Sequence, residues 1–339
     1  MKMIKFTKKG IYCIPGKFYL DPWLPVEYAI ISHGHADHAR WGMKHYLCHT
    51  HTKNILKHRI SDDILVETLG YNEPKTINGV RVSFHPAGHI IGSAQIRLEH
   101  KGKVVVFTGD YKVKDDYITT PFESVKCHEF ITESTFGLPI YKWLPEKVLQ
   151  QQLHDWILQN KANNRTSVLF GYSLGKAQRI MKLVEGLDEI LVHNAIYHSN
   201  NAIESSGIVL PKTTRLDGYF NKADVQNKII IMPPGLLGSK MLTRVPNAAT
   251  AICSGWMQVR GNRRWRGVDA GFAVSDHADW DGLLQAVKES EAEKVYVTHG
   301  SQATFTKYLN KIGIKAQEVI TEYGDNELEA AEAKKEAIT

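Results

Sequence analysis

The chain has 339 residues, of which 43% are hydrophobic and 23% charged, and its formal net charge is +6 at pH 7. This composition is ordinary for a globular protein of roughly two domains, and it excludes collagen, a coiled coil, a disulfide-stabilised miniprotein and bulk disorder. No apolar run approaches the roughly 20 residues that a membrane-spanning helix needs, and no apolar segment follows the basic N-terminus as in a signal peptide. The four cysteines are widely scattered, which indicates reduced thiols in a cytoplasmic protein without a membrane partner.

The first third of the chain predicts short β-strands joined by tight turns. We expect these strands over 11–14, 17–20, 28–32, 80–85, 95–100, 104–108 and 130–132. From about residue 145, helices (145–160, 174–185, 194–205) alternate with strands (167–171, 189–193, 228–232, 249–253). Strands over 271–274 and 294–298 and helices over 279–290 and 302–312 follow. Such alternation indicates a parallel sheet, so a β-rich module is expected to be interrupted by an α/β insert and then resumed.

The strongest functional signal is the segment HGHADH, which follows an apolar strand directly and contains His33, His35, Asp37 and His38. A loop at a strand end can point alternate side chains into one cavity, which a helix cannot do at this spacing. Imidazole and carboxylate are ligands that suit zinc, manganese or iron. Packing these polar groups together without a cation is costly, so the segment predicts a metal site.

One loop cannot fill two coordination spheres, so further ligands are expected at later strand ends. His89 follows one predicted strand through Gly88, and Asp110 follows another through Gly109. Each glycine lets the backbone turn sharply just before a potential ligand. Considered alone, each residue is a weak signal, because His89 could be an ordinary loop histidine and Asp110 could form an Asx turn. Their order after the histidine segment makes them candidate ligands.

These motifs, H-x-H-x-D-H followed by Gly-His and then Gly-Asp, resemble the metallo-β-lactamase fold. Asp21, within Tyr-Leu-Asp-Pro, resembles the first motif of that fold, an aspartate that braces the histidine loop. Three later segments, ITEST, SDHAD and VTHG, resemble motifs A, B and C of the β-CASP nucleases and contain Glu133, His277 and His299. The resemblance extends over about residues 10–322 and is closest to the bacterial ligase-associated DNA exonucleases.

The resemblance implies an α/β fold in which a metallo-β-lactamase αββα sandwich carries an inserted α/β β-CASP domain. The implied parts are 1–137 and 255–325 for the metallo-β-lactamase domain and 138–254 for the insert, with a tail over 326–339. No function is assigned to the tail, whose composition suits a solvated helix or frayed end.

The resemblance also implies two divalent metal ions, zinc or manganese. The implied ligands form two sets that share a bridging Asp110: one metal is held by His33, His35 and His89, and the other by Asp37, His38 and His299. Such a pair suits in-line attack on phosphorus. The implied catalytic residues are Asp37, His277 and Glu133. Among them, His277 would protonate the leaving oxygen, oriented by Glu133, because an imidazole gives up a proton near neutral pH.

Two segments predict contacts with nucleic acid. The first contains Arg260, Arg263, Arg264, Trp265 and Arg266. Arginine pairs with phosphates and tryptophan stacks on bases, although a solvated basic loop is the alternative. The second contains Ser173 and Lys176 at the start of a predicted helix. One interpretation is that both residues bind a phosphate at the helix N-terminus, and the other is that Ser173 is a structural N-cap.

The implied function is a two-metal DNA exonuclease that is directed to 5′ ends and acts in DNA repair. Its substrate would be single-stranded DNA or a duplex end, and its partner a DNA ligase pathway. The alternative is an RNA-processing nuclease of the RNase J or mRNA 3′-end type, because Glu133 and His299 are the residue types of that branch. A thioesterase of the same fold lacks the insert motifs, and a metal-free scaffold would have lost ligands that are all present here.

Overall fold

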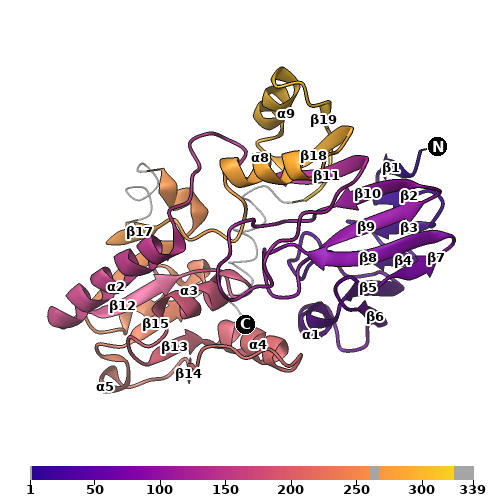
Figure 1. Ribbon diagram of the computed structural model, residues 1–339. Helices are drawn as coiled ribbons and strands as arrows, with labels where there is room; N and C mark the ends of the chain where they lie inside the picture. The colour runs from indigo at the N-terminus through magenta and orange to yellow at the C-terminus, as the bar shows by residue number, and fades with distance from the viewer. Residues whose placement is uncertain (1, 260–266, 324–339) are drawn as a thin grey trace. The chain divides into compact units, whose positions relative to one another are not determined.

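The computed structural model describes residues 2–259 and 267–323, which form two compact units (Figure 1). The first unit contains residues 2–141 and 277–323, and the second contains residues 142–259 and 267–276. These limits differ from the expected 137/138 and 254/255. The later second limit arises because β17 (Ala270–Phe272) pairs with β16 (Ala248–Cys253) inside the second unit. The mixed α/β class expected from the sequence is confirmed.

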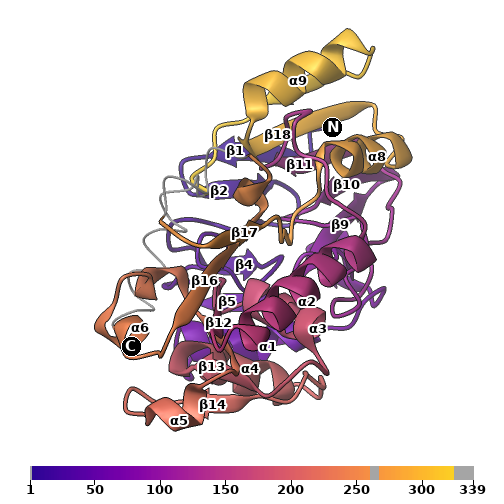
Figure 2. The same cartoon turned by 90° about the vertical axis from the view of Figure 1, so that its left-hand side faces the viewer.

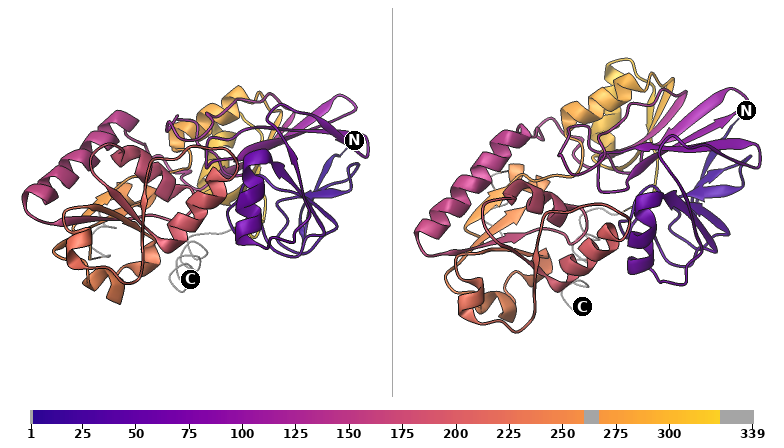
Figure 3. Two further views of the ribbon diagram at one scale, coloured as in Figure 1. Left: turned by 90° about the horizontal axis from the view of Figure 1, so that it is seen from below. Right: turned by 60° about the horizontal axis from the view of Figure 1, so that its bottom comes forward.

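The first sheet belongs to the first unit, and its six strands lie side by side in chain order. They are β1 (Ile4–Thr7), β2 (Gly10–Cys13), β3 (Phe18–Leu20), β4 (Tyr28–Ile30), β5 (His45–His49) and β6 (Val66–Leu69). The two hairpin pairings β1–β2 and β2–β3 are antiparallel, whereas β3 to β6 are parallel. A 3₁₀ turn, η1 (Thr50–Thr52), and α1 (Lys53–Arg59) connect β5 to β6, and Figure 3 shows α1 beside this sheet.

The second sheet of this unit has the strand order β19-β18-β11-β10-β9-β8-β7. The strands are β7 (Lys75–Ile77), β8 (Val80–Pro86), β9 (Ala94–His100), β10 (Lys103–Phe107), β11 (Glu129–Ser134), β18 (Lys294–Gly300) and β19 (Ala316–Glu318). The pairings β10–β11, β11–β18 and β18–β19 are parallel, and β8 and β10 are each antiparallel to β9. The strands β8, β10, β11 and β18 therefore run in one direction.

Among the residues that the structure describes, apolar clusters stabilise the first unit in three places. One joins the two sheets, with Leu47 from the first and Phe84 and Phe107 from the second. Another contains Leu56 of α1 together with residues of β4 and β5. The third joins α8 (Trp280–Glu289) and α9 (Gln302–Lys311) to the second sheet, and Figure 1 shows these helices beside β11 and β18. Each fully buried large apolar side chain stabilises the fold by roughly 1.5–3 kcal/mol.

The second unit contains a parallel sheet with the order β14-β13-β15-β12-β16-β17, which confirms the alternation predicted for this region. Its further strands are β12 (Thr166–Phe170), β13 (Ile190–His193), β14 (Thr214–Leu216) and β15 (Ile229–Met232). Its helices are α2 (Glu146–Ala162), α3 (Lys176–Val184), α4 (Asn194–Glu204), α5 (Lys222–Val225) and α6 (Lys240–Thr243), with short 3₁₀ turns η2 (Pro234–Leu236) and η3 (Gly255–Gln258). Three of these helices pack on the sheet (Figure 2). Helix α2 contacts β12, α3 contacts β15, and α4 contacts β13 and β14.

Among the described residues, no helix is long and apolar enough to cross a membrane. The four cysteines, which all lie in the described ranges, are buried free thiols.

Candidate metal centre

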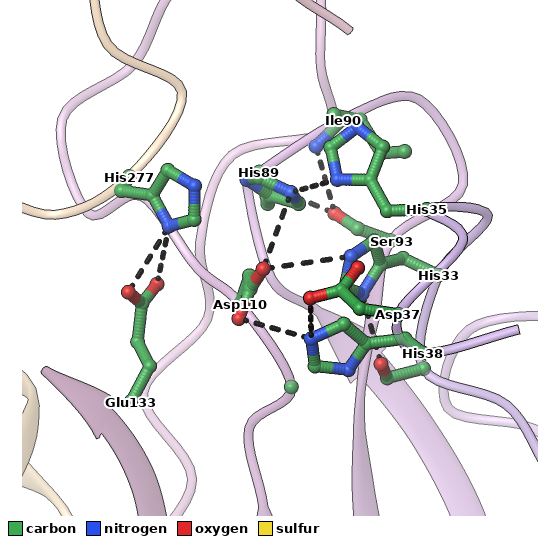
Figure 4. A network of polar contacts seen from close by, with 12 residues as sticks. His33, His35, Asp37, His38, His89, Ile90, Ser93, Asp110, Glu133 and His277 are labelled. Carbon is green, nitrogen blue, oxygen red and sulfur yellow. Dashed lines mark hydrogen bonds and ion pairs between the residues drawn. The ribbon is translucent and has the colours of Figure 1, made fainter. Parts of the chain in front are cut away.

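The histidine segment follows β4 of the first sheet. The other predicted site residues belong to strands of the second sheet that share a direction: His89 follows β8 and Asp110 follows β10, while Glu133 lies in β11 and His299 in β18. Side chains placed at the carboxyl ends of such strands meet at one edge of a sheet. They gather around one space in the first unit, as Figure 4 shows for all of these residues except His299.

Glycines make the close approach of these loops possible. The φ angles of Gly88 and Gly109 are +71° and +56°, in the left-handed region that glycine adopts without steric cost. A Cβ atom at Gly109 would collide with the side chain of Ser32, and one at Gly88 would collide with the carbonyl oxygen of Lys112. The sharp turns that the sequence predicted before His89 and Asp110 are confirmed.

His33, His35, His89 and Asp110 form the first ligand group, whose ligand atoms all lie within 4.8 Å of one another. The ring centroids of His33, His35 and His89 are 4.7–4.9 Å apart, in edge-to-face pairs. The Nε2 atom of His89 lies 3.0 Å from Nδ1 of His35. Three imidazoles and a carboxylate thus converge on one point from three loops.

His38, Asp110 and His299 form the second ligand group, with ligand atoms again within 4.8 Å of one another. Asp37 lies beside it, because its Oδ2 atom is 3.4 Å from Nε2 of His38. The register of β11 and β18 shifts between Thr132 and Ser134, where Thr298 and His299 together stand opposite Glu133. Such a bulge re-aims side chains, and here it occurs at His299.

Asp110 joins the two groups, with one carboxylate oxygen in each. Its Oδ2 atom lies 3.6 Å from Nε2 of His33 and 3.8 Å from Nε2 of His89. Its Oδ1 atom lies 3.0 Å from Nε2 of His299 and 3.4 Å from Nε2 of His38. A single carboxylate is therefore shared between two sets of imidazoles.

Asp21 and Ser32 fix the histidine segment from behind. The fully buried carboxylate of Asp21 accepts hydrogen bonds from the amide and the hydroxyl of Ser32, and its Oδ2 atom is 2.7 Å from Nδ1 of His38. The Ser32 hydroxyl in turn lies 2.9 Å from Nδ1 of His33. Because Nδ1 of each ring is engaged on this side, Nε2 of His33 and of His38 faces the ligand groups.

His277 and Glu133 form a pair at the side of the first group (Figure 4). Nδ1 of His277 lies 3.0 Å from both carboxylate oxygens of Glu133. Glu133 is buried and also accepts a hydrogen bond from the backbone amide of Tyr111, at 2.8 Å. The backbone of the next residue, Ala278, donates to the carbonyl of Tyr111 at 2.6 Å, which anchors the His277 loop. The His277 ring centroid lies 4.6 Å from that of His89.

Burial and neighbouring charges shift the pKa values of His33, His38 and Asp110. Burial lowers the pKa of His33 well below its usual value. Burial acts in the same direction on His38, but the carboxylates of Asp110, Asp37 and Asp21 outweigh it and raise the pKa of His38 to about 10. Burial alone would raise the pKa of Asp110, but the neighbouring rings, His38 foremost, hold it well below its usual value. A divalent cation would supply the positive charge that the His38 proton otherwise supplies.

The donor set fits divalent metal ions. Nε2 of His33 and Nε2 of His38 are buried, and the carboxylate oxygens beside them, at 3.4–3.6 Å, leave both atoms without a hydrogen bond within the described ranges. Buried polar atoms of this kind normally have a partner, and imidazole nitrogen with carboxylate oxygen is the donor set of zinc and manganese sites. The two groups are therefore candidate positions for cations.

The residues predicted to contact nucleic acid do not all fall in the described ranges. Arg260, Arg263, Arg264, Trp265 and Arg266 lie outside them. Ser173 and Lys176 belong to the second unit and are both buried, and Nζ of Lys176 is 3.1 Å from Oδ1 of Asp276. A role in phosphate binding stays a prediction for both.

Sequence reasoning missed three residues that shape the centre. Ser32 directly precedes the histidine segment, and this position was the available signal. Tyr111 acts through its backbone amide, for which residue type carries no signal. The ring of Tyr323 stacks on that of His38 with centroids 4.4 Å apart, yet the sequence separation leaves no local pattern to reveal it.

The chain is similar to several curated proteins. It is 30% identical over 329 residues to a "Probable DNA ligase" of Opitutus terrae, a match that covers 96% of this chain. It is 28% identical over 220 residues to "Endoribonuclease ysh1" of Emericella nidulans (53% of this chain) and 30% identical over 183 residues to an "RNase J-like protein" of Methanocaldococcus jannaschii (47% of this chain). The chain spans 32%, 24% and 43% of the lengths of these relatives, in that order.

Two other comparisons complete the picture. No model of a protein family matches the chain. A crystal structure described as that of a protein of unknown function from Enterococcus faecalis V583 is similar, with a TM-score of 0.57 and 14% sequence identity. That likeness covers 88% of this chain and 80% of the other, and at this identity it shows a shared fold alone.

Proposed function

We propose that this chain, which belongs to the metallo-β-lactamase/β-CASP nuclease family, uses two divalent cations, zinc or manganese, to hydrolyse phosphodiester bonds in DNA. The observation that carries the proposal is the division of Asp110, whose Oδ2 faces His33 and His89 and whose Oδ1 faces His38 and His299. Divalent cations bound at these two groups would supply charge stabilisation and an activated nucleophile for attack on phosphorus. We assign His33, His35 and His89 to one cation, Asp37, His38 and His299 to the other, and Asp110 to both.

We propose that His277 donates a proton to the leaving oxygen and that Glu133 orients the His277 ring. The carboxylate of Glu133 accepts the Nδ1 proton of His277, so proton exchange with the substrate falls to Nε2. A carboxylate at this distance orients the ring, which a general acid or base needs for its proton to reach the reacting atom. The amide of Tyr111 holds Glu133 in place while the ring acts.

The architecture expected from the family is part of the same proposal. Helices pack on the outer faces of two sheets that share a core in the first unit, which supports a metallo-β-lactamase αββα sandwich. The second unit, a parallel sheet that interrupts the first unit in the sequence, supports an inserted β-CASP domain.

DNA is the proposed substrate because the relative matched over 96% of this chain bears the name of a probable DNA ligase. A region equivalent to this chain that forms part of such a protein supports work on DNA ends in repair. We propose an exonuclease that acts from 5′ ends of single strands or of duplexes. RNA is the second candidate, because the relatives named as an endoribonuclease and an RNase J-like protein match parts of the chain at similar identity.

The test is a polarity assay on matched DNA and RNA labelled at the 5′ or the 3′ end, with Mn²⁺ or Zn²⁺ and with the His277→Ala variant as control. Release of labelled nucleotides from the 5′ end of DNA by the wild-type protein alone is the expected result. Degradation of RNA with DNA left intact would transfer the assignment to RNA. A protein that binds cations and leaves both polymers intact would overturn the proposal.

A further inference from the structure

The segment that follows β19 returns to the second ligand group. The ring of Tyr323 stacks on that of His38, with centroids 4.4 Å apart and planes inclined by 10°. It also meets the ring of His299 edge to face, with centroids 5.6 Å apart. One aromatic ring from the end of the described chain therefore touches both imidazoles of this group.

Tyr323 is itself held rigidly. It is 5% exposed, and its ring contacts Trp23 edge to face with centroids 5.5 Å apart. Its hydroxyl donates to the carbonyl oxygen of Leu20, at 3.5 Å, directly before the bracing residue Asp21. A buried aromatic ring with a bonded hydroxyl has little rotational freedom, so its face stays packed against the His38 ring.

Two hydrogen bonds, made by Thr321 and Glu322, attach the same segment to the loops that carry the ligands. The hydroxyl of Thr321 donates to the carbonyl of Thr298, at 2.6 Å, next to His299. Nη2 of Arg40, two residues after His38, donates to the carbonyl of Glu322, also at 2.6 Å. Residues 321–323 thus bond to both loops of the second group.

The histidines of this group are then fixed from two sides. Nδ1 of His38 lies 2.7 Å from Asp21, and Nδ1 of His299 lies 3.0 Å from the hydroxyl of Thr298. These contacts fix the tilt of each ring within its plane, and the Tyr323 ring limits rotation out of it. Partners outside the ligand sphere are what set ring orientation in metal sites, and their loss typically costs about 10–100-fold in metal affinity.

We propose that Tyr323 is a positioning residue for one of the two cations, the one held by His38, His299, Asp37 and Asp110. The inference rests on the proposed two-cation function. It assigns a role to the segment after β19, which neither the motifs nor the comparisons suggest. The aromatic face is the active element, and the hydroxyl adds the anchor to Leu20.

The test counts Mn²⁺ bound by the full-length protein after chelator treatment, using equilibrium dialysis and elemental analysis, for wild type, Tyr323→Ala, Tyr323→Leu and Tyr323→Phe. The leucine variant keeps apolar volume, so it retains a folded protein if the alanine variant loses it. Tyr308→Ala is the control variant, because Tyr308 is a partly buried residue of α9 whose ring packs on that of Trp280, with centroids 4.7 Å apart.

We expect wild type and Tyr308→Ala each to bind two equivalents of Mn²⁺, with the same pair of affinities in both proteins. In Tyr323→Ala and Tyr323→Leu one equivalent keeps its affinity while the other weakens by about 10–100-fold. Tyr323→Phe retains the face of the ring and stays within about 3-fold of wild type at both positions. Nuclease activity at saturating Mn²⁺ returns in the leucine variant.

Equal weakening of both equivalents, no weakening, or a phenylalanine variant as impaired as the leucine variant would overturn the assignment of Tyr323 alone. A wild-type protein that binds fewer than two equivalents would overturn it together with the two-cation function. Two equivalents bound by a wild-type protein that cleaves neither DNA nor RNA would overturn the proposed function while the positioning role stands.

Discussion

The two ligand groups share Asp110 but are built differently. In the first group the rings of His33, His35 and His89 contact one another, with centroids 4.7–4.9 Å apart. In the second group the rings of His38 and His299 are 5.9 Å apart, and each has a partner at Nδ1. Ring-on-ring packing therefore helps to hold the first group, in addition to the Ser32 contact at His33, whereas both rings of the second group are held by contacts from outside the ligand set. Substitutions behind the ligands should therefore separate the two.

The largest effect is expected from Asp110→Ala, which removes the carboxylate that both groups share. Turnover should be abolished and both cations weakened, because each group loses an oxygen ligand at once. Elemental analysis alongside a nuclease assay checks this. Retention of one tightly bound cation would show that Asp110 serves a single group.

His277→Ala should lower kcat by about 10²–10⁴-fold while both cations stay bound, because the ring is proposed to move a proton and not to hold a metal. Steady-state kinetics and elemental analysis on the same preparation measure the two effects. Glu133→Gln is the companion variant, with a smaller loss expected because the ring remains. Unchanged kcat in His277→Ala would remove this residue from the chemistry.

Ser32→Ala and Asp21→Asn should sharpen the comparison. The Ser32 hydroxyl contacts His33, so its loss should weaken one cation by about 10-fold, at the low end of the usual range for such partners. Asp21 contacts His38 directly and His33 through Ser32, so its amide variant should weaken both cations, by up to about 100-fold. Mn²⁺ titrations of the two variants provide the measurement. Identical binding in the two variants would contradict the separate bracing of the groups.

The smallest effect is expected for Gly109→Ala, which perturbs the turn between β10 and Asp110. A left-handed alanine that also collides with Ser32 should lower the free energy of unfolding by roughly 1–3 kcal/mol. Gly102→Ala is the matched control, because Gly102 has a φ of +78° but nothing within 4 Å of its added Cβ. Urea denaturation compares them, and equal losses would mean that the contact with Ser32 carries no energy.

Much of the fold follows from local sequence pattern. The strands β8, β9 and β10 and the helices α2, α4 and α9 lie within about two residues of their predicted limits, because each has a clear period or a clear turn at its ends. The strands β1, β5, β6, β7, β14 and β19 and the short helices α1, α5 and α6 were not predicted. They have three to seven residues, too few for a period to stand out, and their position in the fold depends on tertiary pairing.

The candidate centre shows the same limit. The candidate ligands could be named from the sequence because His33 to His38 form a dense local pattern and the later candidates follow strand ends in order; the structure brings them together. The residues behind them could not, because their role depends on where a distant segment packs. Tyr323 follows β18, α9 and β19 in the chain, and its ring contacts His38 because these elements bring the segment back to the ligand group. Recognition of partners outside the ligand set therefore needs the structure.

The two-cation proposal can be checked by counting the Mn²⁺ bound per chain while the same sample hydrolyses 5′-labelled DNA. We expect two equivalents per chain and hydrolysis that rises as the second equivalent binds. Full hydrolysis with one equivalent bound, or two equivalents bound with the DNA intact, would contradict it.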